Sequence, residues 1–197
     1  MESRDNMIEA AKQQDVNEVL PLILSAIGSI AYTLSGTEDD ERTWELLAGD
    51  FISEHNRISY RNIIVDRIDG RIAGMLISYR GDDADELDQP FRERLESIYG
   101  AGAGDKLTVE CQPGDYYLDA VAVDERFRGQ GIAKRLIAAF EGQGEQKRCS
   151  RLSLIVEPDN TAAYSLYQRS GYKDDGELTV SGSRYIRMIK PFEFSES

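Results

Sequence analysis

The sequence predicts an α/β fold in which a mixed sheet carries helices on its faces. Short apolar runs typical of strands alternate with segments whose apolar residues recur at helical spacing. An Asp-Gly pair joins two strand-like runs in the first half, and strands and helices alternate in the second half. The chain has 197 residues, 41% of them hydrophobic and 30% charged, which suits one domain with a sizeable core.

The first half reads as a strand, two helices and a hairpin. Met7–Ala10 can form a short strand, and Asp15 is a fair N-cap for a helix that runs to Ile27. Thr37 is expected to open a second helix, because the acidic residues that follow it suit the positive end of a helix dipole. Asp69-Gly70 lies between two apolar runs and predicts a tight turn between paired strands.

Residues 81–114 interrupt this series of predicted strands and helices. They hold an acidic run, a short helix expected over Pro90–Tyr99 and a Gly/Ala-rich loop. The stretch has too few apolar residues for a core of its own, so we expect an insertion in a single domain that spans 1–197. The predicted elements after it are a strand at 116–123, a helix at 129–141, a strand at 152–156, a helix at 160–170, and strands near 172–180 and 184–190.

Charge and composition exclude several classes of protein. The chain has 23 basic and 36 acidic residues, and 23 − 36 gives −13, which disfavours nucleic acid and anionic membrane surfaces as partners. Cys111 and Cys149 form no CxxC motif, and His55 is the single histidine, so we expect no metal site. An acidic N-terminus and interrupted apolar stretches predict an acidic cytoplasmic protein without a signal peptide or membrane span.

The segment 121–133 carries the strongest chemical signal. An apolar strand enters a turn that contains Gly129 and Gly131, and the turn opens a helix. The first N–H groups of a helix lack intrahelical acceptors and sit at the positive end of the dipole, so they bind anions. Glycines let the backbone approach a phosphate, and Arg126 and Arg128 add positive charge.

Several known phosphate-binding loops contain a glycine-rich turn between a strand and a helix. A dinucleotide-binding fingerprint needs a glycine where Lys134 stands, and a P-loop needs a Gly-Lys-Ser/Thr sequence that is missing here. An ordinary strand-to-helix turn stays an alternative. The sequence Arg126-Phe-Arg-Gly-Gln-Gly131 resembles the Gln/Arg-x-x-Gly-x-Gly/Ala signature of the GCN5-related N-acetyltransferases, which bind the pyrophosphate of coenzyme A at this turn.

The resemblance extends over most of the chain except 81–114. Asn160 to Tyr172 is similar to the family's Asn-x-x-Ala-x-x-Leu-Tyr-x-x-x-Gly-Phe/Tyr segment, and the opening strand and helix are similar too. It implies a mixed, mostly antiparallel central sheet flanked by helices. It also implies an enzyme that transfers an acetyl group from acetyl-CoA, its cosubstrate, to a primary amine by direct attack in a ternary complex. The acceptor would be a small molecule or a peptide, and family members are often dimers, so a homodimer is possible here.

The resemblance assigns the cofactor contacts. The backbone of Val121, Ala122 and Val123 would bind the pantetheine arm, on a strand that splays from its neighbour, and polarise the thioester carbonyl. Asn160 would bind the pantetheine amides, a role compatible with capping its helix. The pyrophosphate would lie on Arg128, Gly129, Gln130, Gly131, Ile132 and Ala133.

Two residues are candidates for proton transfer. Tyr167 lies where the family places the tyrosine that protonates the departing thiolate; otherwise its ring packs in the cleft. Asp119 lies where many members carry a glutamate base, and two-residue alternation would turn it to the same side as Val121 and Val123. A structural hydrogen-bonding role for Asp119 is the alternative, and Glu110 is a weaker candidate base.

The acidic run at residues 82–88 bears on the acceptor. Carboxylates near the acceptor edge would attract a cationic amine, unless the run is simply a solvated charged surface. A function from another class is also compatible with the motifs: a non-catalytic acyl-CoA-binding module would keep the loop and Asn160 without needing Tyr167 or Asp119.

Overall fold

The structure is a computed structural model, and it describes residues 6–192. Its strands form one seven-stranded sheet in the order β1-β2-β3-β4-β5-β7-β6, in which only β4 and β5 run parallel. The predicted mixed, mostly antiparallel sheet is therefore confirmed. The strands are β1 (Asn6–Ala10), β2 (Ile63–Ile68), β3 (Arg71–Arg80), β4 (Asp115–Val123), β5 (Arg151–Val156), β6 (Lys173–Val180) and β7 (Ser183–Pro191).

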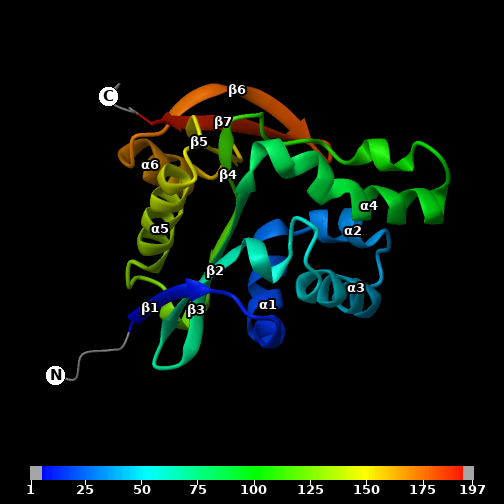
Figure 1. The fold of residues 1–197 in the computed structure, drawn as a ribbon, viewed down its shortest axis with the longest axis horizontal. Helices are drawn as coiled ribbons and strands as arrows, with labels where there is room; N and C mark the ends of the chain where they lie inside the picture. Colours follow the sequence, from blue (N-terminus) through cyan, green and yellow to red (C-terminus); the bar gives the residue numbers. More distant parts are fainter. Residues whose placement is uncertain (1–5, 193–197) are drawn as a thin grey trace.

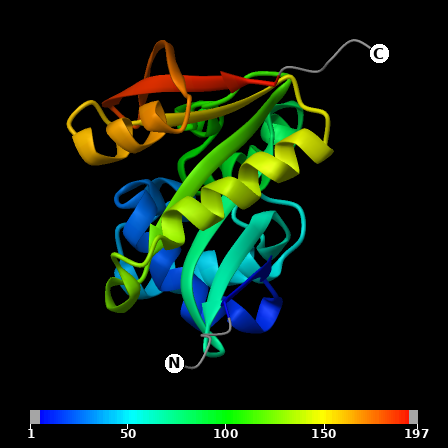
Figure 2. The ribbon, with the colours of Figure 1, turned by 90° about the vertical axis from the view of Figure 1, so that its left-hand side faces the viewer.

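Helices cover both faces of the sheet (Figures 1 and 2), so two apolar cores form. One core lies under α1 to α4 and the other under α5 and α6. None of the helices in the described range 6–192 is long and apolar enough to cross a membrane. The helices are α1 (Val16–Ile27), α2 (Ile30–Ser35), α3 (Asp40–Ile52), α4 (Ala84–Tyr99), α5 (Ile132–Gln146) and α6 (Thr161–Arg169), with short 3₁₀ turns at Gln13–Asp15, Tyr60–Asn62, Gly81–Asp83, Ala103–Lys106 and Glu125–Phe127.

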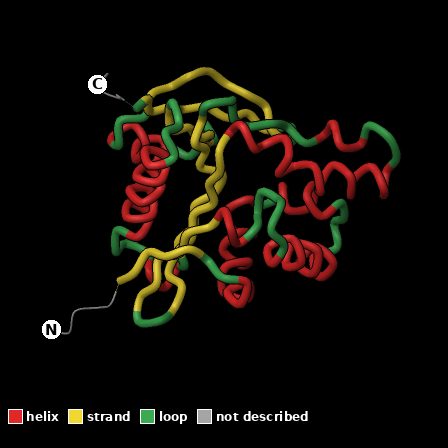
Figure 3. The backbone as a smooth tube through the Cα atoms, viewed as in Figure 1, coloured by secondary structure: helices red, strands yellow, loops and turns green. Residues whose placement is uncertain are grey.

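Three predicted helix starts were wrong. The helix expected over 129–141 begins at Ile132, after Gly131 in the left-handed conformation, and runs to Gln146. The second helix begins at Asp40 rather than Thr37, because Asp39 is the N-cap and accepts a hydrogen bond from the Arg42 backbone at 2.7 Å. The insertion helix α4 begins at Ala84 and passes through Pro90 without ending. Its buried face packs against the α1–α4 core, and this tertiary packing outweighs the local cost of the proline. Figure 3 shows the additional short helix α2 before α3.

The parallel pair β4 and β5 is joined at one end only. Asp115–Leu118 pair with Arg151–Leu154, and beyond this point β4 pairs only with β3 on its other side. The splayed strand that the resemblance implies is therefore present in the fold. The parting leaves the backbone of β4 from residue 119 to residue 123 without a strand neighbour on the β5 side.

A β-bulge in β4 determines where Asp119 points. Leu118 pairs with Ser78 and Ala120 with Ile77, so Asp119 is the extra residue in the ladder. One extra residue inverts the alternation of side chains. Val121 packs in the α5–α6 core, whereas Asp119 turns to the opposite face and bonds with residues there. The prediction that Asp119 faces the same way as Val121 and Val123 was therefore wrong.

Candidate active site

A cavity of about 420 Å³ opens where β4 and β5 part. Its wall includes Asp119, Val121, Asn160 and Tyr167, four residues that the sequence singled out. The turn between β6 and β7 and the segment that joins α1 to α2 close its other sides. The predicted pyrophosphate loop does not line this cavity and lies at the N-terminus of α5.

Arg57 is the centre of a buried ionic group that we call the Arg57 cluster: Arg57, Asp88, Glu110 and Asp119. Arg57 Nε and Nη2 donate to the two oxygens of Asp119, each at 2.9 Å. Nη2 also donates to Glu110 at 3.1 Å, and Nη1 donates to Asp88 at 3.4 Å. The four side chains are 5 or 6% exposed. One guanidinium thus faces three carboxylates.

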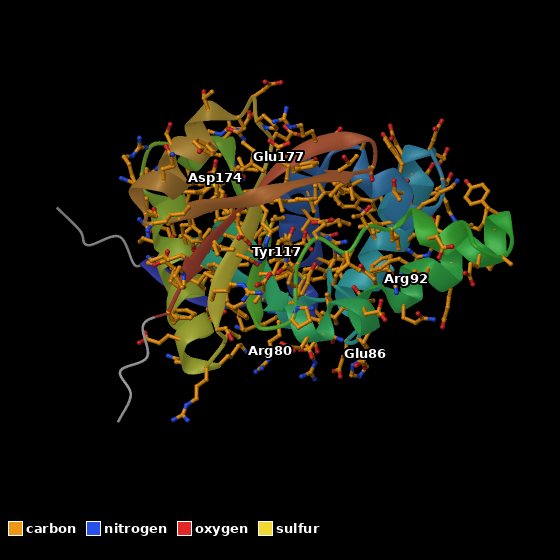
Figure 4. All side chains as sticks on the ribbon, turned by 90° about the horizontal axis from the view of Figure 1, so that it is seen from above. Arg80, Glu86, Arg92, Tyr117, Asp174 and Glu177 are labelled. Carbon is orange, nitrogen blue, oxygen red and sulfur yellow. The ribbon has the colours of Figure 1, made fainter. Side chains whose placement is uncertain are left out.

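Two tyrosines extend the Arg57 cluster. Tyr79 donates to Asp119 at 3.0 Å, and Tyr117 donates to Glu110. Figure 4 places Tyr117 among the densely packed side chains of the interior. Burial raises the pKa of Glu110 and of Asp88, while the opposing charge of Arg57 acts to lower both. Because the carboxylates outnumber the guanidinium, this side of the cavity favours a cation.

Sequence reasoning missed Arg57 and left the place of Asp88 open. Arg57 lies in a loop, and no local motif marks it, because its partners are 31, 53 and 62 residues away along the chain. Asp88 belongs to the acidic run of the insertion, yet it is 3% exposed and faces Arg57 rather than solvent. For this residue, the alternative of a solvated charged surface is wrong.

Tyr167 lies on α6 and reaches the cavity from the face opposite the Arg57 cluster. It is 6% exposed, and its ring meets the edge of Tyr172 at 5.8 Å between centroids. Burial raises the pKa of the Tyr167 phenol to about 12. The phenol therefore keeps its proton at physiological pH and is available as a donor. Tyr164, one turn earlier, is half-buried, and its hydroxyl donates to Asp174 at 2.9 Å.

Asn160 caps α6. Its side-chain oxygen accepts a hydrogen bond from the Ala163 backbone at 3.1 Å, as expected for an N-cap. The side chain also lines the cavity. Because the cap uses the carbonyl oxygen, the amide nitrogen is the part of the group that can donate to a ligand.

The predicted anion loop has the backbone that such a site needs. Gly129 and Gly131 have φ angles of +76° and +75°, which side chains rarely adopt, and α5 begins at the next residue. Arg126 pairs with Asp124 at 2.7 Å, and Arg128 lies 3.4 Å from Glu125 with both side chains exposed. The N–H groups of the first turn of α5 thus follow a turn with two exposed arginines, each of which is paired with a carboxylate.

The remaining candidates lie outside this chemistry. His55 is exposed, and both cysteines are buried, with burial raising the pKa of Cys111 to about 12. Over residues 6–192, no group of three or more His, Cys, Asp or Glu side chains is arranged to hold a metal ion.

Comparison with known sequences gives partial but consistent matches. The family model described as Acetyltransferase (GNAT) family matches residues 29–172. A spermine/spermidine N(1)-acetyltransferase of Bacillus subtilis (strain 168) is 35% identical over 74 residues, which are 37% of this chain and 49% of that protein. An L-2,4-diaminobutyric acid acetyltransferase of Halomonas elongata is 39% identical over 57 residues, 29% of this chain and 30% of that protein. The chain thus spans half or less of the length of these curated relatives.

Solved structures match over nearly the whole chain. A crystal structure described as an acetyltransferase has a TM-score of 0.77 and 31% identity, and the match covers 95% of this chain and 100% of that one. An N-acetyltransferase from Staphylococcus aureus Mu50 shares the fold with a TM-score of 0.76 at 22% identity, covering 93% and 100%. Since the family model covers most of the residues and a full-length relative shares the fold, the chain belongs to the acetyltransferase (GNAT) family.

Proposed function

We propose that this protein transfers an acetyl group from acetyl-CoA to the primary amine of a cationic acceptor, by direct attack in a ternary complex. The observation that carries the proposal is the cavity between β4 and β5. It gathers Asp119, Asn160 and Tyr167 beside a stretch of β4 backbone that has no strand partner on that side. Proton donors and acceptors thus surround one space that is lined by unpaired backbone.

The acetyl-CoA would lie along the parted strand and the anion loop. In this proposal, the backbone groups of Val121, Ala122 and Val123 bind the pantetheine arm, and Asn160 donates to one of its amides. The turn from Arg128 to Ala133 holds the pyrophosphate, which its two left-handed glycines and the first N–H groups of α5 support. A β4 amide directed at the thioester oxygen would stabilise the negative charge that develops there.

The chemistry needs a proton removed from the acceptor ammonium and a donor for the departing sulfur. Asp119 accepts the ammonium proton, and the amine nitrogen then forms its bond to the acetyl carbon while the carbon–sulfur bond breaks. Tyr167 donates to the departing sulfur from the opposite wall of the cavity. The newly bonded nitrogen gives up its second proton, which returns through solvent to Tyr167, and Asp119 releases its proton to solvent. Arg57 holds Asp119 in place through both carboxylate oxygens.

A cationic acceptor is favoured by the charge of the cavity. Glu110, Asp119 and Glu157 line it with Arg57, so acids exceed bases among the charged residues of its wall. Such a surface attracts an amine-bearing cation and repels an anion. The names of the relatives, which include polyamine and diaminobutyrate acetyltransferases, support this acceptor class.

The test is a panel of amines, with release of free thiol from acetyl-CoA as the readout. The panel contains a polyamine, a diamino acid, an aminoglycoside and a lysine peptide. We expect at least one cationic amine to be acetylated by the wild type. The Tyr167→Phe variant is expected to lower kcat by about 100-fold or more, the usual contribution of a positioned acid, with little change in acetyl-CoA affinity.

Tyr164→Phe is the matched control, because it removes a phenol one turn away that bonds to Asp174 instead of lining the cavity. We expect it to leave turnover nearly unchanged. If calorimetry shows acetyl-CoA binding but no amine in the panel releases thiol, the alternative of a non-catalytic acyl-CoA-binding module is favoured. If Tyr167→Phe retains wild-type turnover, the assigned role of Tyr167 is wrong.

A further inference from the structure

A buried ion pair links the sheet to the first turns of α5. Asp66, in β2, is fully buried, and Arg135 reaches it from α5. Arg135 Nε donates to Asp66 Oδ2 at 2.9 Å, and Nη2 lies 2.7 Å from the same oxygen. A carboxylate that is buried among apolar strands needs a partner of opposite charge, and Arg135 supplies it.

The sheet beside Asp66 is shaped to receive this part of α5. Gly74 of β3 pairs with Asp66, and a Cβ atom at Gly74 would lie 2.8 Å from Ile132 Cγ2 and 3.1 Å from Leu136 Cδ1. Only a glycine lets these two side chains approach so closely. The apolar contact at Gly74 and the ion pair at Asp66 therefore seat the start of α5 at one point of the sheet.

The same arginine also reaches into the anion loop. Arg135 Nη1 donates to the backbone carbonyl oxygen of Gln130 at 2.9 Å. Gln130 lies between the two left-handed glycines, Gly129 and Gly131, whose backbone angles shape the loop. One guanidinium is thus bonded at once to a fixed point in the sheet and to the middle of the loop.

We propose that Asp66 and Arg135 are positioning residues that hold the anion loop in its coenzyme-binding conformation. Asp66 lies beneath α5 and cannot touch the coenzyme, so it acts only through Arg135. This inference rests on the proposed function, since it assumes that the loop binds the pyrophosphate of acetyl-CoA. It predicts a defect in coenzyme affinity and not in the chemical step.

The experiment measures acetyl-CoA affinity by calorimetry, together with KM and kcat. Asp66→Asn and Arg135→Gln are each expected to raise the dissociation constant about tenfold, with kcat at saturating acetyl-CoA nearly unchanged. Arg67→Gln is the matched control, because Arg67 is the next residue of β2 and pairs with Glu9 and Asp15 instead of with Arg135. It is expected to leave the affinity as in the wild type.

Two further variants separate positioning from charge. The double variant Asp66→Asn/Arg135→Gln should bind no more weakly than either single variant, because both changes break one linkage. Arg135→Lys keeps the positive charge but lacks the guanidinium group that reaches both Asp66 and Gln130. We therefore expect this variant to bind acetyl-CoA weakly too. It also serves as the test if Arg135→Gln fails to fold.

The outcomes distinguish the two proposals. A wild type that does not bind acetyl-CoA overturns the proposed function, and the positioning role falls with it. A wild type that binds acetyl-CoA, with Arg135→Gln or Arg135→Lys binding equally well, overturns the positioning role alone. Additive losses in the double variant would also contradict it, because they would show that Asp66 acts independently of Arg135.

Discussion

Arg57 carries the charge that makes the burial of its three acidic neighbours tolerable. Burial raises the pKa of Asp88 and of Glu110, so keeping these carboxyl groups ionised in this interior costs free energy. Direct hydrogen bonds from one guanidinium to all three offset part of that cost. Arg57 is therefore a structural requirement for the acidic wall of the cavity, whatever part each carboxylate plays in the chemistry.

Replacing Arg57 with methionine is expected to lower the free energy of unfolding by about 3–5 kcal/mol, because buried carboxylates lose their partner. Denaturant titration would measure the change. Arg61→Met is the matched control, since Arg61 is an exposed arginine paired with Glu54. It is expected to leave stability nearly unchanged. An equal effect of the two substitutions would contradict the role given to Arg57.

At the scale of residues, sequence reasoning finds those that belong to a motif and misses those that depend on distant neighbours. Tyr167, Asn160 and Asp119 were singled out from motif spacing, and all three line one cavity. Arg57 has no motif and was missed. The predicted direction of the Asp119 side chain was wrong, because a β-bulge shifts the pairing of β4 by one residue. No glycine or proline in β4 marks this bulge in the sequence.

Among the elements, α5 packs closely on the sheet at its N-terminal end. It covers one face of the sheet and presents its N-terminus to the anion loop (Figure 2). Its first turn lies on Gly74, where there is no room for a side chain. The position of the helix thus depends on a single glycine in a neighbouring strand.

Gly74→Ala is expected to lower the free energy of unfolding by about 1–3 kcal/mol, as an overpacked contact does, and to raise KM for acetyl-CoA. Thermal unfolding and steady-state kinetics would measure both effects. The control is Gly142→Ala within α5, where a Cβ meets nothing within 4 Å. It should raise stability by about 0.5–1 kcal/mol, because alanine favours a helix. A Gly74→Ala variant as stable as the wild type would show that α5 shifts freely.

Element types were easier to predict than element starts. Local sequence signals predicted the Asp69-Gly70 turn, the strands of the second half and α6. These elements depend mainly on residues that are close together in the sequence. The start of α4 was missed because Pro90 normally ends or opens a helix. Its true start depends on packing of buried residues such as Phe91 against other helices, and the sequence alone does not show that packing.

At the scale of the whole molecule, Asp115 joins the two halves of the sheet. It is fully buried at the paired end of β4 and β5. Arg187 of β7 donates to both of its oxygens, at 2.7 and 3.1 Å, and Ser153 of β5 donates at 2.9 Å. Burial acts to raise the pKa of Asp115, but the hydrogen bonds from Arg187, the Gln112 backbone and Ser153 outweigh it and lower the pKa.

This lowered pKa has a defined consequence for acid stability. An unfolded aspartate titrates near about 3.9, so the contribution of Asp115 is complete above that pH and is lost as pH falls through the lower folded-state pKa. We expect denaturant titrations between about pH 6 and pH 2 to show a steeper loss for the wild type than for Asp115→Asn. Parallel loss in both proteins would contradict this account.

The parting of β4 and β5 also gives the sheet free strand edges in its interior. It creates two strand edges in the middle of the sheet, and a cavity lies between them. An outer edge of this kind invites aggregation, but an inner one accepts only a slender molecule that carries its own amides, much as a peptide is added to a strand. A bound ligand of that shape would lie between β4 and β5 like an eighth strand. The gap in the sheet would then be filled only while the ligand is bound.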